Sequence, residues 1–181
     1  MSTTYLALLR GINVGGKNKL LMSDLREIFD EVGCRDVRTY IQSGNVIFEA
    51  SPHAATALPG LITAQIAERF GLRVPVVLRT VEQIAEVIQH NPFLNTEGTA
   101  ENMLHVLFLA AAPSAKRVSS LDPDRSPPDA FVVHGEEIYL RLPDGAARTK
   151  LTNAYFDTKL ATMSTGRNWQ TVTKLLALMT V

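Results

Sequence analysis

The sequence is poor in the features that most often reveal a protein's activity: cysteine, charge of one sign, and long apolar runs. Its one cysteine, Cys34, cannot form an internal disulfide, so we expect a small buried apolar side chain. Lys and Arg number 18, as do Asp and Glu, so no net field draws the molecule to nucleic acid or a membrane. The early apolar run 5–9 is too short for a signal peptide or a membrane span. We therefore expect a cytoplasmic protein without membrane attachment.

The chain also lacks a recognisable catalytic arrangement. Its histidines have no helical i, i+4 spacing and no cysteine beside them, so we predict no metal site. Ser43 does not stand in a G-x-S-x-G motif, which excludes the nucleophile elbow of many hydrolases. No cofactor is indicated, catalytic residues are unknown, and the sequence leaves open whether the protein is an enzyme.

What the chain does have is the patterning of an α+β protein. Its 181 residues, 46% of them hydrophobic, can bury a full core. We predict a helix that begins with Ser23 as its N-cap and a hairpin with a two-residue turn, Ser43-Gly44. Strand, helix, strand, strand, helix and strand are expected, in turn, at residues 5–9, 23–33, 37–42, 45–49, 59–70 and 74–78.

This order of elements is that of a ferredoxin-like βαββαβ unit, whose antiparallel sheet has the strand order 4-1-3-2. Pro75 cannot donate a hydrogen bond to a sheet ladder, which fits a fourth strand at the edge. In this topology the loop after the first strand and the turn around Ser43 lie at the same end of the sheet. Because the first and third strands are neighbours, we expect these two polar corners to touch.

The second half of the chain repeats the pattern in degenerate form. Thr80 and Gln83 make a capping box for a connecting helix, and the polar segment 95–102 is the expected boundary. A strand from Met103, a short helix and a second hairpin follow, and then helices at about 153–160 and from Asn168. The predicted division is a ferredoxin-like unit at 1–80, a connecting helix and linker at 81–102, and a second α+β unit with C-terminal helices at 103–181.

The stretch R-G-I-N-V-G-G-K-N-K at residues 10–19 is the first candidate site. Its glycines allow positive φ angles, so that backbone amides can turn together toward an anion, and no acid occurs before Asp24. The stretch matches all but the last position of the phosphate-loop pattern G-x-x-x-x-G-K-[ST]. Asn18 stands where that motif needs a hydroxyl for magnesium, which argues against a nucleotide triphosphatase. An ordinary glycine-rich turn is the competing interpretation.

We predict that the neighbouring turn completes this site with neutral donors and acceptors, although a plain Ser-Gly turn would look the same in sequence. The predicted ligand-binding residues of the two corners are Arg10, Gly11, Asn13, Gly15, Gly16, Lys17, Gln42, Ser43 and Asn45.

These residues carry a resemblance to a known family. The chain contains L-L-R-G-I-N-V-G-G-K-N near its start, Y-I-Q-S-G-N-V-I-F at 40–48, N-P-F at 91–93 and T-G-R-N-W-Q-T-V-T-K-L at 165–175. Together they resemble the bacterial family known as domain of unknown function sixteen-ninety-seven, over essentially the whole chain. The resemblance implies a two-unit α+β architecture, and it brings no activity, substrate or catalytic residue. Gln170 stands where the family usually has Asn.

The C-terminal motif adds Arg167, Asn168 and Trp169 to the predicted ligand-binding residues. They fall at the start of the last predicted helix, where unpaired amides favour an anion and an indole ring can stack on a base. An N-cap asparagine followed by a buried tryptophan is the equally ordinary structural interpretation. If this helix packs over the glycine-rich loop, Arg10, Lys17, Arg167 and Lys174 form one basic patch.

Three classes of function stay open on the sequence alone. The first is binding of a small anionic, phosphate-bearing molecule at the loop end of the first sheet, with or without catalysis. The second is single-stranded nucleic-acid binding on the sheet face, although the aromatic motif of such domains is missing. The third is a structural or regulatory module that associates with a protein partner through an exposed sheet edge.

Overall fold

The computed structural model describes residues 1–181, which form a mixed α+β structure with two four-stranded antiparallel sheets and seven α-helices. The chain divides into two compact units. The first contains Met1–Ile84 and Leu175–Val181, and the second contains Ala85–Lys174. None of the helices has both the length and the hydropathy needed to cross a bilayer.

The first unit has the predicted order of elements and the predicted sheet. Its strands are ordered β2-β3-β1-β4, all antiparallel, so the 4-1-3-2 order is confirmed. Pro75 directly precedes the edge strand β4. The elements are β1 (Thr3–Leu9), α1 (Met22–Glu31), β2 (Arg35–Tyr40), β3 (Asn45–Ala50), α2 (Pro52–Ala55), α3 (Leu58–Phe70) and β4 (Val76–Thr80).

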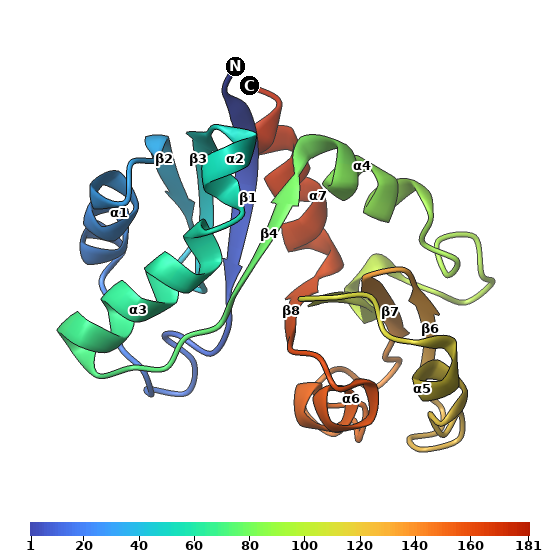
Figure 1. Ribbon diagram of the computed structural model, residues 1–181. Coiled ribbons are helices and arrows are strands. Elements are labelled where there is room, and N and C mark those ends of the chain that lie inside the picture. The colour runs from blue at the N-terminus through green and yellow to red at the C-terminus, as the bar shows by residue number, and fades with distance from the viewer. The chain divides into compact units, whose positions relative to one another are not determined.

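Helices α1 and α3 cover one face of this sheet (Figure 1). Alternation along β1 directs Tyr5, Ala7 and Leu9 toward them, and all three side chains are buried in the same core. Phe48 lies at its centre, stacked on Tyr5 at 5.8 Å and edge-on to Phe29 at 5.2 Å between ring centroids. Burial of one such ring contributes roughly 1.5–3 kcal/mol to stability. Cys34 is buried here as predicted, and burial raises the pKa of its thiol to about 11.

Two local predictions in the first unit are wrong. The N-cap of α1 lies two residues earlier than predicted, because Leu21 holds that position and Ser23 lies inside the first turn. The β2–β3 connection is also longer than a two-residue turn, because the last pair of the ladder is Tyr40 with Asn45. Ile41 takes a φ of 48° in that connection, a left-handed conformation that is rare for a β-branched residue.

The capping box at Thr80 and Gln83 is confirmed. The Thr80 amide donates to Gln83 Oε1 at 2.9 Å, and the Gln83 amide donates to Thr80 Oγ1 at 3.3 Å. These bonds satisfy two of the amides that a helix start leaves open. They begin α4 (Val81–Gln89), which starts in the first unit and ends in the second.

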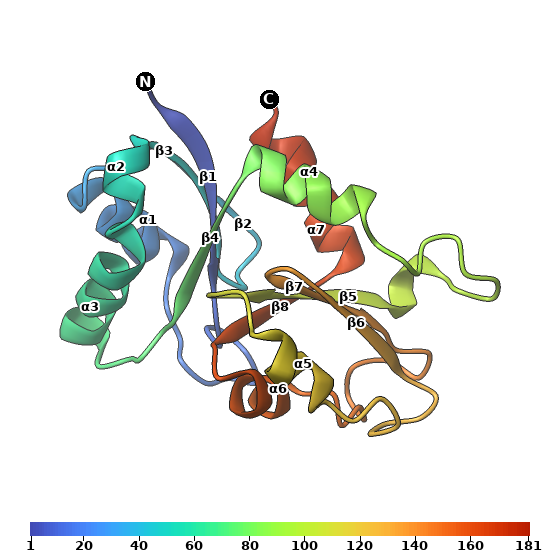
Figure 2. The ribbon, with the colours of Figure 1, turned by 45° about the vertical axis from the view of Figure 1, so that its right-hand side comes forward.

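The second unit repeats the topology of the first. Its sheet has the order β6-β7-β5-β8, the same crossover pattern as β2-β3-β1-β4. Its helices α5 and α6 cover one face of the sheet (Figure 2). The elements are the 3₁₀ turn η1 (Glu101–Met103), β5 (Leu104–Leu109), α5 (Ala115–Ser119), β6 (Ala130–His134), β7 (Glu137–Arg141), α6 (Asn153–Leu160), β8 (Ser164–Asn168) and α7 (Trp169–Met179).

The strand β8 was not predicted. Its sequence S-T-G-R-N has no apolar alternation, and glycine and asparagine are depleted in strands. The strand forms because β5 supplies a full antiparallel partner, from His105 with Asn168 to Leu109 with Ser164. This added strand completes the second four-stranded sheet and makes the repeat closer than the sequence indicates.

Candidate functional site

The glycine-rich loop is a small hairpin. The Lys17 amide donates to the Val14 carbonyl at 3.0 Å, and the Asn13 amide donates to the Asn18 carbonyl at 3.1 Å. At the tip, Gly15 and Gly16 have φ angles of 57° and 73°. Positive φ at both central residues is typical of tight hairpin turns. The glycines therefore serve to close the hairpin turn. In a nucleotide-binding loop, by contrast, the glycines let the backbone wrap around a phosphate.

Asn13 joins this hairpin to the β2–β3 turn. Its Oδ1 accepts from the Leu20 amide at 2.9 Å, and its Nδ2 donates to the carbonyls of Leu20 at 2.9 Å and Gln42 at 2.8 Å. At the loop base, Asn18 Nδ2 donates to the Gly11 carbonyl at 2.9 Å. The predicted contact between the two polar corners is therefore confirmed, and Asn13 is the residue that makes it.

The rest of the second corner supports the turn. The Leu9 amide of β1 donates to the Gly44 carbonyl at 2.8 Å, so the backbones are in direct contact. Asn45 is fully buried, and its Nδ2 donates to the Tyr40 carbonyl at 3.1 Å and to Ser43 Oγ at 3.0 Å. These bonds give Ser43 and Asn45 a structural role in the turn.

A hollow of about 410 Å³ opens where the hairpin, the turn and the start of α1 meet. Of the predicted residues it contains Asn13, Gly16 and Gln42, whereas Arg10, Gly11, Gly15, Lys17, Ser43 and Asn45 are not among its lining residues. Its remaining lining residues are Lys19, Leu20, Leu21, Met22 and Asp24.

None of these five was among the predicted binding residues, and two of them, Lys19 and Asp24, are charged. Lys19 had a signal in the sequence, because it belongs to the basic loop. Asp24 also lines the hollow, from the first turn of α1.

The C-terminal motif has ordinary structural roles within the second unit. Asn168 Oδ1 accepts from the Thr171 amide at 2.8 Å and so caps α7, while Trp169 is 2% exposed. Arg167 is buried in β8, and its guanidinium donates to Thr165 Oγ1 at 3.0 Å and to the Gly166 carbonyl at 2.7 Å. Burial lowers the pKa of Arg167 to about 10, so the group stays protonated at neutral pH. The single basic patch proposed for both ends of the chain stays a prediction.

No three side chains of His, Cys, Asp or Glu come together as a metal-ligand set. His90 and His134 of the second unit stack with ring centroids 5.4 Å apart. Two imidazoles in a stacked arrangement do not point their nitrogens at one ion.

Comparison with known proteins agrees with this architecture. The model of a family described as "Protein of unknown function (DUF1697)" matches residues 2–139, a range that contains both polar corners of the first unit. The chain belongs to this family. Among solved structures, the conserved bacterial protein SP0830 from Streptococcus pneumoniae is similar over 100% of both chains, with a TM-score of 0.76 and 22% sequence identity. At that identity the likeness shows the fold of this DUF1697 member and nothing of its function. No curated protein matches the chain.

Proposed function

We propose that this DUF1697 protein binds a small phosphate-bearing ligand in the hollow beside the glycine-rich loop. The observation that carries the proposal is the convergence of three things on one cavity. They are the uncapped start of α1, the basic residue Lys19 and the polar residue Gln42, all of which line it.

The start of α1 supplies unsatisfied donors. Leu21 at the N-cap offers no side-chain acceptor, so the first amides of the helix have no partner inside the protein. A helix start stabilises a nearby anion by about 0.3–1 kcal/mol through these amides and the helix dipole. Leu21 and Met22 line the hollow, so the start of α1 borders it.

The charged side chains define the ligand further. Lys19 and Asp24 line the same hollow without forming an ion pair with each other or with any other residue. A bare phosphate satisfies Lys19 and leaves Asp24 facing an anion. A sugar phosphate satisfies both, because its hydroxyl groups donate to the carboxylate while the phosphate accepts from Lys19 and the helix amides.

A lysine pair supplies the test. Lys19→Ala removes the side chain of a residue that lines the hollow. Lys17→Ala removes a nearby exposed lysine that is not among the lining residues. Inorganic phosphate, a panel of sugar phosphates and mononucleotides are titrated by thermal shift and calorimetry. A binding sugar phosphate should stabilise the wild type and Lys17→Ala by about 2.7 kcal/mol at a hundredfold excess over Kd. Lys19→Ala should lose most of this stabilisation.

Three other results decide against parts of the proposal. Equal losses in both variants would place the ligand on the wider basic rim, with Lys17 and Arg10. No stabilisation by any phosphate compound in the panel overturns the proposal. A third result is that Asp24→Asn strengthens phosphate binding and the protein shows no preference for sugar phosphates. The hollow would then still be an anion site, but its ligand would not be a sugar phosphate.

Nucleic-acid binding on the first sheet face has less support. Besides the face covered by α1 and α3, the sheet has a second face that carries Leu6, Leu8, Ile47 and Val77, which are 0–3% exposed. Bases cannot stack on side chains that solvent does not reach. The edge strand β2 is likewise a poor template for a partner strand, because its register shifts between Arg35 and Arg38 and Asp36 has a φ of 49°.

We also infer that both units are ferredoxin-like. Each has the order strand, helix, strand, strand, helix, strand, with α2 as an addition before α3 in the first. Each sheet has the antiparallel order expected of that fold. In this interpretation the candidate site occupies the loop after the first strand of the first repeat, and the second repeat has no glycine-rich counterpart.

A further inference from the structure

A second cavity, of about 280 Å³, lies entirely within the second unit and has no part in the proposed phosphate site. Its floor is the sheet face that α6 covers. His105 and Leu107 of β5 share that face with Leu140 of β7, because His105 pairs with Leu140 in the ladder and successive residues alternate between faces. Leu142 and Leu151 complete an apolar floor.

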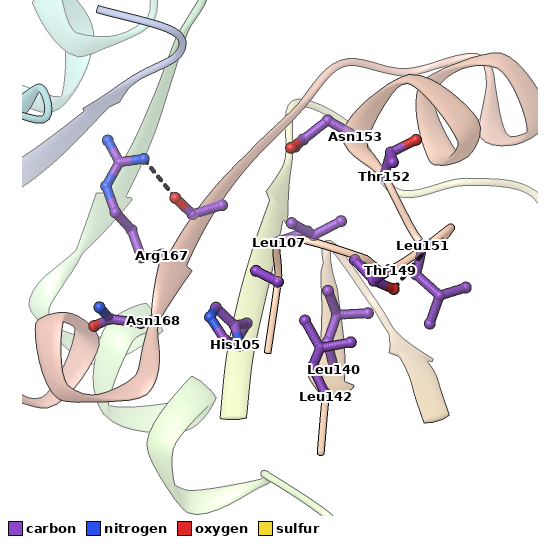
Figure 3. A pocket seen from close by; sticks show the side chains of 12 residues that line it. His105, Leu107, Leu140, Leu142, Thr149, Leu151, Thr152, Asn153, Arg167 and Asn168 are labelled. Carbon is purple, nitrogen blue, oxygen red and sulfur yellow. Dashed lines mark hydrogen bonds between the residues drawn. The ribbon is translucent and has the colours of Figure 1, made fainter. Parts of the chain in front are cut away.

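The interior of the cavity carries no charge. Its lining residues include no Asp, Glu or Lys. Arg167 belongs to the lining, but its side chain points away from the leucines, and its guanidinium bonds to Thr165 Oγ1 and the Gly166 carbonyl (Figure 3). Burial lowers the pKa of the His105 ring and so favours its neutral form, an effect that the nearby backbone of Met103 opposes only in part. An ionised ligand would therefore lose its hydration without gaining a counter-charge.

Four polar side chains surround this floor, and each uses only part of its hydrogen-bonding capacity within the protein. Thr149 Oγ1 accepts from the Leu151 amide at 3.1 Å, and Thr152 Oγ1 accepts from the Tyr155 amide at 3.2 Å. Both hydroxyl protons stay available. Asn168 keeps its Nδ2 donors, since its Oδ1 caps α7. Asn153 keeps its Oδ1 acceptor, since its Nδ2 donates to Ser164 Oγ at 2.8 Å.

These bonds also hold the four groups in place before any ligand arrives. Thr152 is the N-cap of α6 and Asn168 the N-cap of α7, so both side chains are fixed by the helices they start. Gly166 keeps the floor open beside them, because a Cβ at that position would lie 2.8 Å from Leu107 Cδ2. A preorganised polar rim over an apolar floor is the usual construction of a small-molecule site.

We propose that this cavity binds a small uncharged molecule with a flat apolar body and a donor–acceptor edge, the chemistry shared by nucleobases and aromatic carboxamides. The apolar body lies on the leucine floor. Its carbonyl oxygen accepts from a threonine hydroxyl or from Asn168, and its N–H group donates to Asn153 Oδ1. The cavity is near the lower end of the range of about 300–1,000 Å³ for ligand pockets, so the ligand is of single-ring or double-ring size.

The test uses benzamide and uracil as uncharged probes, and benzoate and benzylamine as charged molecules of the same shape as benzamide. Binding is followed by calorimetry and by amide chemical shifts of labelled protein. We expect at least one uncharged probe to bind at millimolar concentration or better and to shift the amides of Thr149, Asn153 and Gly166. Both charged probes should bind about tenfold more weakly or worse, a difference of about 1.4 kcal/mol.

Adjacent alanines supply matched variants. Ala146 and Ala147 are both exposed, and only Ala146 lines the cavity. Ala146→Trp should block the mouth and abolish the probe shifts, whereas Ala147→Trp should leave them unchanged. Because both substitutions are at the surface, equal melting temperatures show that neither has unfolded the protein.

Several results would overturn the proposal. One is the absence of shifts at the cavity with every uncharged probe. Another is benzoate binding as well as benzamide, which would mean that charge is not excluded. A third is equal loss of binding in Ala146→Trp and Ala147→Trp. None of these outcomes bears on the phosphate site of the first unit, which the lysine pair tests separately.

Discussion

Gly44 occupies a position at which the β2–β3 turn touches β1. Its φ is 83°, and a Cβ placed on it would lie 2.8 Å from Leu9 Cβ and 3.1 Å from Ile12. Both the conformation and the space therefore require glycine. Since this contact sets the distance between the two polar corners, Gly44 positions the candidate site without taking part in it.

We expect Gly44→Ala to destabilise the protein, by about 1–2 kcal/mol for the left-handed conformation alone and by more because the new Cβ displaces Leu9. Gly60→Ala is the matched control. Gly60 lies inside α3, with nothing within 4 Å of an added Cβ, so alanine there should stabilise the protein by roughly 0.5–1 kcal/mol. Urea unfolding of both variants gives the two free energies. A neutral Gly44→Ala would mean that the turn can move away from β1 without loss.

Residue types alone could not separate structural from functional roles in these corners. The glycine pair at 15–16 and the polar run at 42–45 were correctly expected to lie together, because topology fixes which loops share an end of the sheet. Their individual roles depend on hydrogen bonds that sequence does not show. The side chain of Asn13 forms hydrogen bonds with Leu20 and Gln42, and Asn45 is buried. Neither side chain is therefore as available to a ligand as its polarity suggests.

At the scale of elements, the first turn of α1 is where a difference between the sequence-based expectation and the structure affects the candidate site. Ser23 is a better N-cap residue than Leu21 by intrinsic preference, yet the helix begins at Met22. Leu20 is buried, while Leu21 is 68% exposed. The burial of Leu20 therefore fixes where the chain enters α1, and Leu21 is left at the N-cap position. Packing has overridden the capping preference, and an uncapped helix start opens into the hollow as a result.

Leu21→Ser should supply the missing cap. A serine hydroxyl at this position can accept from a first-turn amide, which is typically worth 0.5–2 kcal/mol, and the change removes an exposed apolar side chain. We expect a higher free energy of unfolding in urea together with weaker phosphate binding, because the serine oxygen competes for the same amides. Leu21→Ala is the control that removes the leucine without adding a cap. If both variants bound phosphate as the wild type does, the amides of α1 would have no part in the site.

The strands show where periodicity is sufficient and where it is not. The strand β3 has apolar alternation, and its predicted range of 45–49 ends one residue before the observed end at Ala50; Pro75 correctly indicated that β4 lies at an edge. The strand β8 has polar residues and a glycine, and it exists only because β5 pairs with it. A strand that depends on its partner cannot be read from its own sequence.

On the scale of the whole molecule, no single position in the sequence separates the two units. The C-terminal residues Leu175–Val181 belong to the first unit, although the rest of α7 belongs to the second. The sequence-based division at 80 and 102 follows the elements in order, and such a division cannot assign a terminal segment to the unit at the opposite end of the chain. Long-range contacts decide this assignment, and they leave no local signal.

This membership makes a prediction for Met179, which is 4% exposed and lies in the segment assigned to the first unit. Met179→Ala should destabilise that unit by about 2–5 kcal/mol, the usual effect of truncating a buried side chain. Native-state hydrogen exchange should then be faster at the amides of β1 and β3, with a smaller change at β6 and β7. Thr180→Ala, at an exposed neighbouring position, is the control and should change neither. Faster exchange confined to β6 and β7 in Met179→Ala would contradict the assignment, because it would mean that the last helix stabilises only the repeat in which it begins.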